Sequence, residues 1–257
     1  MKKINEFATI KFSEIASIDE LHYPLLEPML QVEIPAQGYI NKLENSCFIL
    51  GNNGWCYQLG NKSDVEFNNS IIDLLEIEML ERKEILWFGV PKINQKKNKF
   101  GLNVSSRYEF EYIGSGDYRI NNNHEYAIYF AEEADLRQLY YKHEDISTYW
   151  SSLDKYIKNG FSYVAKIEDQ IIGYVTSASY CRSIVEIDIW TDERYRGQGI
   201  STTLCKCFIG YCNKEDLIPK WDCSEDNQTS INLAKKLGFR IKKKYDLGYI
   251  FQNQNIV

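Results

Sequence analysis

Residues 194–199, with the sequence RYRGQG, combine two arginines and two glycines directly before an expected helix. The N-terminus of a helix presents unpaired N–H groups and a partial positive charge. Glycine lets the backbone approach a ligand closely, and arginine adds charge-assisted hydrogen-bond donors. The stretch therefore predicts an anion-binding loop, for which a phosphate group is the natural ligand. The alternative is that Gly197 and Gly199 only make a turn.

A strand and a helix are expected to position this loop. Residues 184–190 alternate between two sets of side chains. One set is apolar, Val185, Ile187 and Ile189, and the other is mixed, Glu186, Asp188 and Trp190. This period of two predicts a strand with one apolar face. After the loop, apolar residues recur at helical spacing, namely Ile200, Leu204, Phe208 and Tyr211.

Three of the seven cysteines, Cys205, Cys207 and Cys212, fall in the helix expected after the loop. Helical residues two positions apart point to different sides, and none of the three histidines is near these cysteines in the sequence. We therefore expect core or surface thiols and no metal site. The seven cysteines follow no disulfide-scaffold spacing, which indicates reduced thiols in a cytoplasmic protein.

Composition narrows the possible functions. The 257 residues are 44% hydrophobic and 26% charged, with a formal net charge of −6. An acidic chain argues against broad binding to nucleic acid or to an anionic membrane. No apolar run has the length of a membrane span, and the first residues lack the apolar core of a signal peptide.

Turn-rich residues around 114–117 and 121–123 predict a boundary between two domains, 1–117 and 118–257. The first part has a hairpin signal at Asn53 and Gly54, and a helix expected from Asn69 or Ser70 to about Glu84. It carries no motif with an assignable chemistry. The sequence leaves open whether this part shapes a substrate pocket, mediates formation of a homodimer or is purely structural.

The second part alternates strands and helices. A helix capped by Ser147 and ended by Gly160 is expected, then strands, the strand–loop–helix described above and a last helix beginning near Asn227. Two final strands, residues 239–245 and 248–251, are expected to form a hairpin. This order predicts a mixed α/β sheet flanked by helices, preceded by a smaller N-terminal α/β domain.

The second half resembles the GNAT superfamily of acyl-CoA N-acyltransferases. Arg194-x-x-Gly197-x-Gly199 matches the family's acyl-CoA loop without a gap, between a strand and a helix. Residues 237–239, Leu-Gly-Phe, match the family's usual end of the last helix, and the element order over about 126–251 also fits. A closer likeness is to a bacterial subgroup with an added N-terminal domain.

The resemblance implies acetyl-CoA as the co-substrate, an amine acceptor and direct attack in a ternary complex. The pyrophosphate would lie on the loop amides, and the pantetheine would enter a gap between the strands that carry Trp190 and Trp221. Backbone amides near 189–191 would face the thioester carbonyl. The implied cofactor-binding residues are Ile189, Trp190, Thr191, Arg194, Arg196, Gly197, Gln198, Gly199, Ile200, Ser201, Asn227 and Ser230. For Asn227, helix capping is an equal alternative.

An amine must be neutral to attack a thioester, so a base or a water chain has to remove its proton. Glu186 is the first candidate, because several enzymes of the family use a carboxylate of this strand. Asp188 is the second and Asp222 the third. A salt bridge or hydrogen bond in a groove is the alternative role for each of these carboxylates.

The expected general acid departs from the family pattern. Many members carry a tyrosine seven residues after the asparagine of the last helix, and here that position is Ala234. Tyr245, Tyr249 or a water would have to substitute, although a thiolate is a tolerable leaving group without an acid. The absent tyrosine keeps a second interpretation open, a non-catalytic acyl-CoA-binding sensor or interaction module.

Overall fold

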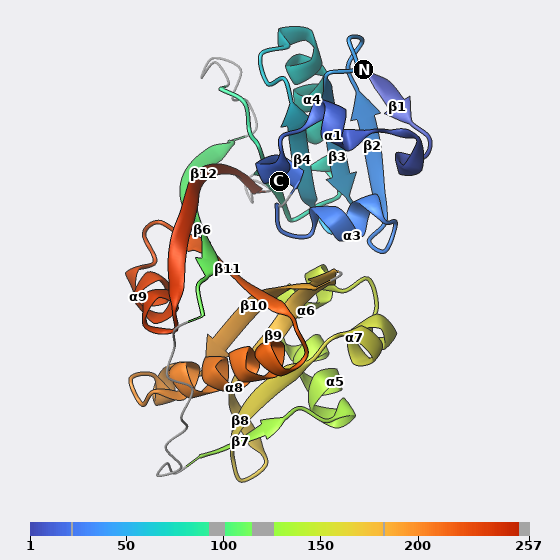
Figure 1. Ribbon diagram of the computed structural model, residues 1–257. Coiled ribbons are helices and arrows are strands. Elements are labelled where there is room, and N and C mark those ends of the chain that lie inside the picture. The colour runs from blue at the N-terminus through green and yellow to red at the C-terminus, as the bar shows by residue number, and fades with distance from the viewer. Residues whose placement is uncertain (22, 93–100, 115–125, 182, 252–257) are drawn as a thin grey trace. The chain divides into compact units, whose positions relative to one another are not determined.

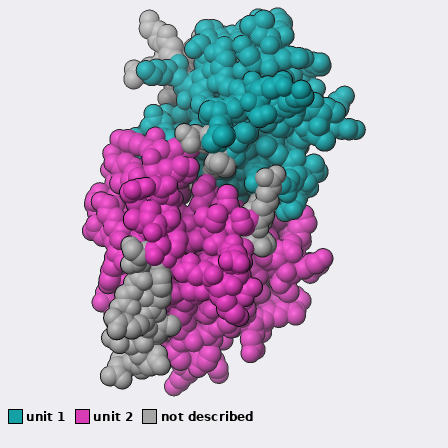
Figure 2. All heavy atoms as spheres, viewed as in Figure 1, with its two compact units in different colours: residues 1–107, 245–257 teal, residues 108–244 magenta. Residues whose placement is uncertain are grey.

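The computed structural model describes most of the chain, namely residues 1–21, 23–92, 101–114, 126–181 and 183–251. The chain forms two compact units, residues 1–107 with 245–257, and residues 108–244 (Figure 2). The boundary predicted at 117/118 lies outside the described residues and stays a prediction. Among the described residues, no helix is both long and apolar enough to cross a membrane.

The first unit is built on a sheet of short strands. These are β1 (Lys2–Ile4), β2 (Ala36–Ile40), β3 (Ser46–Gly51), β4 (Trp55–Gly60), β5 (Glu84–Phe88) and the end of β12 (Phe239–Phe251). Its helices are η1 (Phe7–Thr9), α1 (Phe12–Ile15), α2 (Ile18–Leu21), α3 (Leu26–Leu30) and α4 (Val65–Glu78). Strands β1 to β4 pair antiparallel in succession, and β4 pairs parallel with β5.

The expected hairpin between β3 and β4 is confirmed, and Gly54 takes the positive φ of 85° that its turn needs. Helix α4, however, begins several residues earlier than predicted. The Asp64 carboxylate accepts a hydrogen bond from the Phe67 N–H at 3.0 Å and so caps the helix. Ser70, a predicted cap, instead donates its hydroxyl to the Glu66 carbonyl inside the helix.

The second unit is a larger sheet with helices on both faces (Figure 1). Its strands are the second half of β6 (Asn103–Tyr112), β7 (Ala127–Phe130), β8 (Ser162–Ile167), β9 (Gln170–Cys181), β10 (Ile184–Thr191), β11 (Ile218–Ser224) and the start of β12. Its helices are α5 (Glu133–Lys142), α6 (Glu144–Tyr149), α7 (Leu153–Asn159), η3 (Glu193–Tyr195), α8 (Ile200–Lys214) and α9 (Gln228–Lys236). The strands lie in the order β12-β6-β11-β10-β9-β8-β7.

Two hydrophobic clusters cover the two faces of this sheet. Ala165 of β8 belongs to the cluster that contains residues of α8 and α9, whereas its neighbour Val164 belongs to the cluster that contains residues of α5, α6 and α7. Successive strand residues point to opposite faces, so the sheet is buried between two helical layers. The predicted mixed α/β sheet flanked by helices is confirmed.

Two further local predictions are wrong. The helix expected from Ser147 is two short helices, because Ser152 accepts from the Lys155 N–H and starts α7 separately. The expected C-terminal hairpin is one continuous strand, β12. Its residues 247–251 pair antiparallel with β5, and Leu247 and Ile250 are buried, so a turn at this point would lose both contacts.

The two units share one pattern of strand pairing. In each, three antiparallel pairings are followed by a parallel pairing across a helix: β1 to β5 with α4, and β7 to β11 with α8. The first unit therefore repeats the topology of the second, although the sequence shows no matching motif there.

Candidate functional site

Strands β10 and β11 start as a parallel pair and then separate. Paired register between them covers only residues 184–186 of β10, ending at Glu186 opposite Lys220, whereas the strands continue to Thr191 and Ser224. A β-bulge against β9 between Glu186 and Ile187 accompanies the change. The strands thus part between Trp190 and Trp221, as the resemblance implied.

A groove of about 760 Å³ occupies the region where these strands separate. Its lining residues are Ile189, Trp190, Thr191, Tyr195, Arg196, Gly197, Gly199, Ile200, Ser201, Thr202, Trp221, Asn227, Thr229, Ser230, Asn232, Leu233 and Lys236. Every predicted cofactor-binding residue lines it except Arg194 and Gln198. Sequence reasoning missed the face of α9 that lines the groove, Thr229, Asn232, Leu233 and Lys236, whose i, i+3, i+4, i+7 spacing was the available signal.

The glycine loop opens onto this groove. Gly197 and Gly199 have φ of 82° and 81°, and a side chain built on either would meet nothing within 4 Å. Gly199 is the N-cap of α8 and provides no side-chain cap to the helix amides. A left-handed backbone, open space and uncapped amides together fit an anionic group such as a pyrophosphate.

The two loop arginines have different surroundings. The Arg194 guanidinium binds both carboxylate oxygens of Asp192, at 3.1 and 2.7 Å. These hydrogen bonds lower the pKa of Asp192 to about 2. Arg196 donates from Nε to the Thr191 carbonyl at 3.3 Å and lines the groove. Arg196 also lies 3.3 Å from the exposed Glu193 carboxylate, and it differs from Arg194 in that it lines the groove.

Helix α9 presents polar groups to the groove from its first turn. Asn227 caps the helix by accepting from the Ser230 N–H at 3.0 Å, so the capping alternative is confirmed for a residue that also lines the groove. The Trp221 indole donates to the Ser230 hydroxyl oxygen at 3.0 Å. Ala234 is fully buried in the core, as are Cys205 and Cys212.

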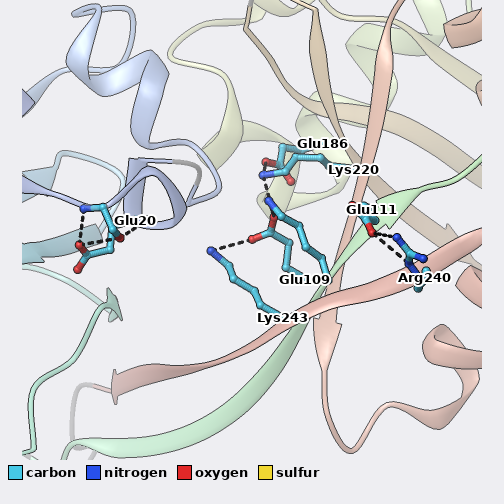
Figure 3. Close-up of polar contacts among 9 residues, drawn as sticks. Glu20, Glu109, Glu111, Glu186, Lys220, Arg240 and Lys243 are labelled. Atoms are coloured by element: carbon cyan, nitrogen blue, oxygen red, sulfur yellow. Dashed lines mark hydrogen bonds and ion pairs between the residues drawn. The ribbon is translucent and has the colours of Figure 1, made fainter. Parts of the chain in front are cut away.

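Glu186 lies on β10 where the two strands begin to separate. Its Oε1 is 3.7 Å from Lys220 Nζ, and its side chain is only 12% exposed (Figure 3). Burial raises its pKa; the charge of Lys220 opposes this, while the nearby carboxylates of Asp222 and Glu109 add to it. Glu186 is thus a largely buried carboxylate next to one ammonium group.

Asp188 has aromatic rather than cationic surroundings. It accepts a hydrogen bond from the Tyr174 hydroxyl at 3.3 Å, and the Tyr174 ring stacks with Trp190 at 5.8 Å. Burial, reinforced by the charge of Asp145, raises the pKa of Asp188 to about 6. A carboxyl group with this pKa changes charge close to neutrality.

Tyr245, the proposed substitute acid, belongs to the first unit. Its ring centroid is 5.6 Å from that of Tyr23 and 6.1 Å from that of Phe88. Glu186 and Asp188 belong to the second unit, so the structure does not bring the three predicted catalytic residues together within one unit.

The described residues also contain no group of three or more side chains that could hold a metal ion.

Comparisons with known proteins agree with this geometry. The sequence pattern of the GNAT acetyltransferase family matches residues 29–247. The uncharacterized N-acetyltransferase YdfB of Bacillus subtilis (strain 168) is 34% identical over 101 residues, which are 39% of this chain and 39% of that relative. The chain thus matches well under half of that protein's length.

Two solved structures share the fold. A GCN5-related N-acetyltransferase-like protein from Streptococcus suis 89/1591 has a TM-score of 0.66 at 20% identity, covering 86% of this chain and 90% of that chain. A GCN5-related N-acetyltransferase from Sphaerobacter thermophilus has a TM-score of 0.60 at 12% identity, covering 90% and 87%. At these identities the likeness establishes the fold alone.

Proposed function

Because the chain belongs to the GNAT acetyltransferase family, we propose that it is an N-acetyltransferase. It moves the acetyl group of acetyl-CoA to a primary amine of a small molecule or peptide by direct attack in a ternary complex. The observation that carries this proposal is the groove between β10 and β11, which begins at an uncapped, glycine-lined helix N-terminus. The acidic chain suits a cationic acceptor.

Different residues of the groove bind different parts of acetyl-CoA. The bound acetyl-CoA supplies an acetyl group activated as a thioester. The amides of residues 197–200 receive the pyrophosphate, with Arg196 and Lys236 as flanking cations. Asn227 and Ser230 offer hydrogen bonds to the pantetheine amides. The backbone of residues 189–191, which borders the groove beyond the part of β10 that pairs with β11, supplies donors for the developing oxyanion.

Glu186 acts as the general base on the acceptor amine. A primary amine is mostly protonated at neutral pH and has to lose a proton before or during attack. A carboxylate whose pKa burial has raised is a better proton acceptor than an exposed one, and Glu186 lies where the strands open. Asp188 is the second candidate. The leaving thiolate takes its proton from water.

Binding of acetyl-CoA to paired glycine variants tests the site. Gly197→Glu places bulk and a negative charge in the loop, so we expect affinity to fall roughly 100-fold. Gly210→Glu is the matched control: it lies later in α8, and an added side chain there meets nothing within 4 Å. Isothermal titration calorimetry measures both; wild-type affinity in Gly197→Glu would place the donor elsewhere.

A further inference from the structure

Glu109 is a buried acid beside the proposed base. It lies on β6, is 4% exposed, and contacts Lys220 of the neighbouring strand β11 with an Oε1–Nζ distance of 3.7 Å. The same Lys220 ammonium lies 3.7 Å from Glu186 Oε1 on the other side (Figure 3). One lysine therefore bridges two carboxylates across three adjacent strands.

Two lysines of β12 hold Glu109 from its other side. Lys243 Nζ is 3.0 Å from Glu109 Oε2, and Lys242 Nζ is 3.2 Å from Oε1. Burial alone would raise the pKa of Glu109, but Lys220, Lys243 and Lys242 together keep it below its usual value. Glu109 is thus a fixed negative charge beside the Lys220 ammonium group, on the side away from Glu186.

We propose that Lys220, anchored by Glu109, is the positioning residue for Glu186: it fixes the orientation of that carboxylate where the strands open and keeps it ionised for proton transfer. The ion-paired bridge exists whether or not the protein catalyses acetyl transfer, whereas its role in catalysis rests on the proposed function of Glu186 as the base.

The bridge predicts that removing the Lys220 charge and removing the Glu109 charge shift the titration midpoint of Glu186 in opposite directions. The charged groups that face Glu186 are Lys220 and Asp222 from β11 and Glu109 from β6. Removing the Lys220 charge takes away the cation that favours the carboxylate, so the titration midpoint of Glu186 rises. Removing the Glu109 charge removes its repulsion of the Glu186 carboxylate. Lys220 then pairs with Glu186 alone, so the titration midpoint of Glu186 falls. Opposite shifts establish that the two charges act on Glu186 through the bridge, and the pH profile of turnover then decides whether the bridge serves catalysis.

Carbon-13 NMR of the full chain, with glutamate side-chain carboxyls labelled, measures this midpoint directly. Glu186→Gln assigns the signal, and Lys220→Met and Glu109→Gln are the test variants. Glu111→Gln is the matched carboxylate control, because it lies two residues further on β6 and binds Arg240 Nε at 3.0 Å. Lys244→Met, which removes a cation paired with Glu225 at 2.7 Å, is the lysine control.

We expect the midpoint to rise in Lys220→Met, to fall in Glu109→Gln and to stay at the wild-type value in both controls. No shift in the test variants, or shifts of the same sign, would overturn the proposal. Lys220→Arg retains the cation and should restore the wild-type midpoint, and it remains informative if Lys220→Met does not fold.

Turnover separates this proposal from the proposed function. Acceptor-dependent thiol release from acetyl-CoA should show its acidic limb at higher pH in Lys220→Met and at lower pH in Glu109→Gln. Opposite midpoint shifts in a protein whose Glu186→Gln variant is fully active would support the bridge and overturn Glu186 as the base. Absent midpoint shifts with an inactive Glu186→Gln would overturn the bridge and leave the base in place.

Discussion

Glu186 and Asp188 lie two residues apart on β10, yet their surroundings give them different chemistry. Glu186 has an ammonium group within 3.7 Å and further carboxylates around it. Asp188 has a tyrosine hydroxyl and aromatic rings instead. The sequence placed both on one strand and ranked Glu186 first, but it could not predict their surroundings, because Lys220, Glu109 and Tyr174 come from other strands.

Asp188 should make stability depend on pH. Its pKa rises from about 3.9 in the unfolded chain to about 6 in the folded protein. The folded state thus binds this proton more tightly, and the stabilisation that results is complete below pH 4 and lost as pH rises through 6. Asp188→Asn removes this dependence while still accepting from Tyr174.

Urea unfolding at pH 4 and pH 7.5 checks the prediction for Asp188. Relative to the wild type, the free energy of unfolding of Asp188→Asn should gain about 2 kcal/mol on going from pH 4 to pH 7.5. If the free energies of unfolding of the two proteins differ by the same amount at both pH values, folding does not raise the pKa of Asp188.

At the scale of elements, prediction succeeded where the signals are local. The glycine loop, the strand before it and the helix after it depend on residues within one short stretch, and all three form as expected. It failed where a contact distant in sequence decides. The predicted turn between the last two strands is absent because residues 247–251 pair with β5. The early start of α4 is a different kind of failure, because its cap, Asp64, is a local signal that the sequence prediction overlooked.

The continuity of β12 can be tested by deleting a buried side chain near its end. Ile250 is fully buried in the first unit, whereas Ile241 of the same strand is 36% exposed. Ile250→Ala should therefore lower the free energy of unfolding by about 2–4 kcal/mol, and Ile241→Ala by much less. Chemical denaturation measures both variants; equal losses would contradict the burial of β12 in the first unit.

The whole molecule contains one strand pattern twice but only one glycine loop. In the first unit, residues 61–64 join β4 to α4, and the Asp64 carboxylate occupies the helix N-terminus where the second unit has open amides. A carboxylate at that point repels a phosphate. We therefore propose that acyl-CoA binds at the N-terminus of α8 in the second unit and not at that of α4 in the first.

Acetyl transfer by the second unit is the central claim, and thiol release from acetyl-CoA in the presence of a panel of primary amines tests it most directly. We predict acceptor-dependent release by the wild type and by Glu225→Gln, an ion-paired carboxylate control, and a loss of about 10²- to 10⁴-fold in Glu186→Gln. Tight acetyl-CoA binding without acceptor-dependent release across the panel would contradict the claim and indicate a non-catalytic acyl-CoA-binding module.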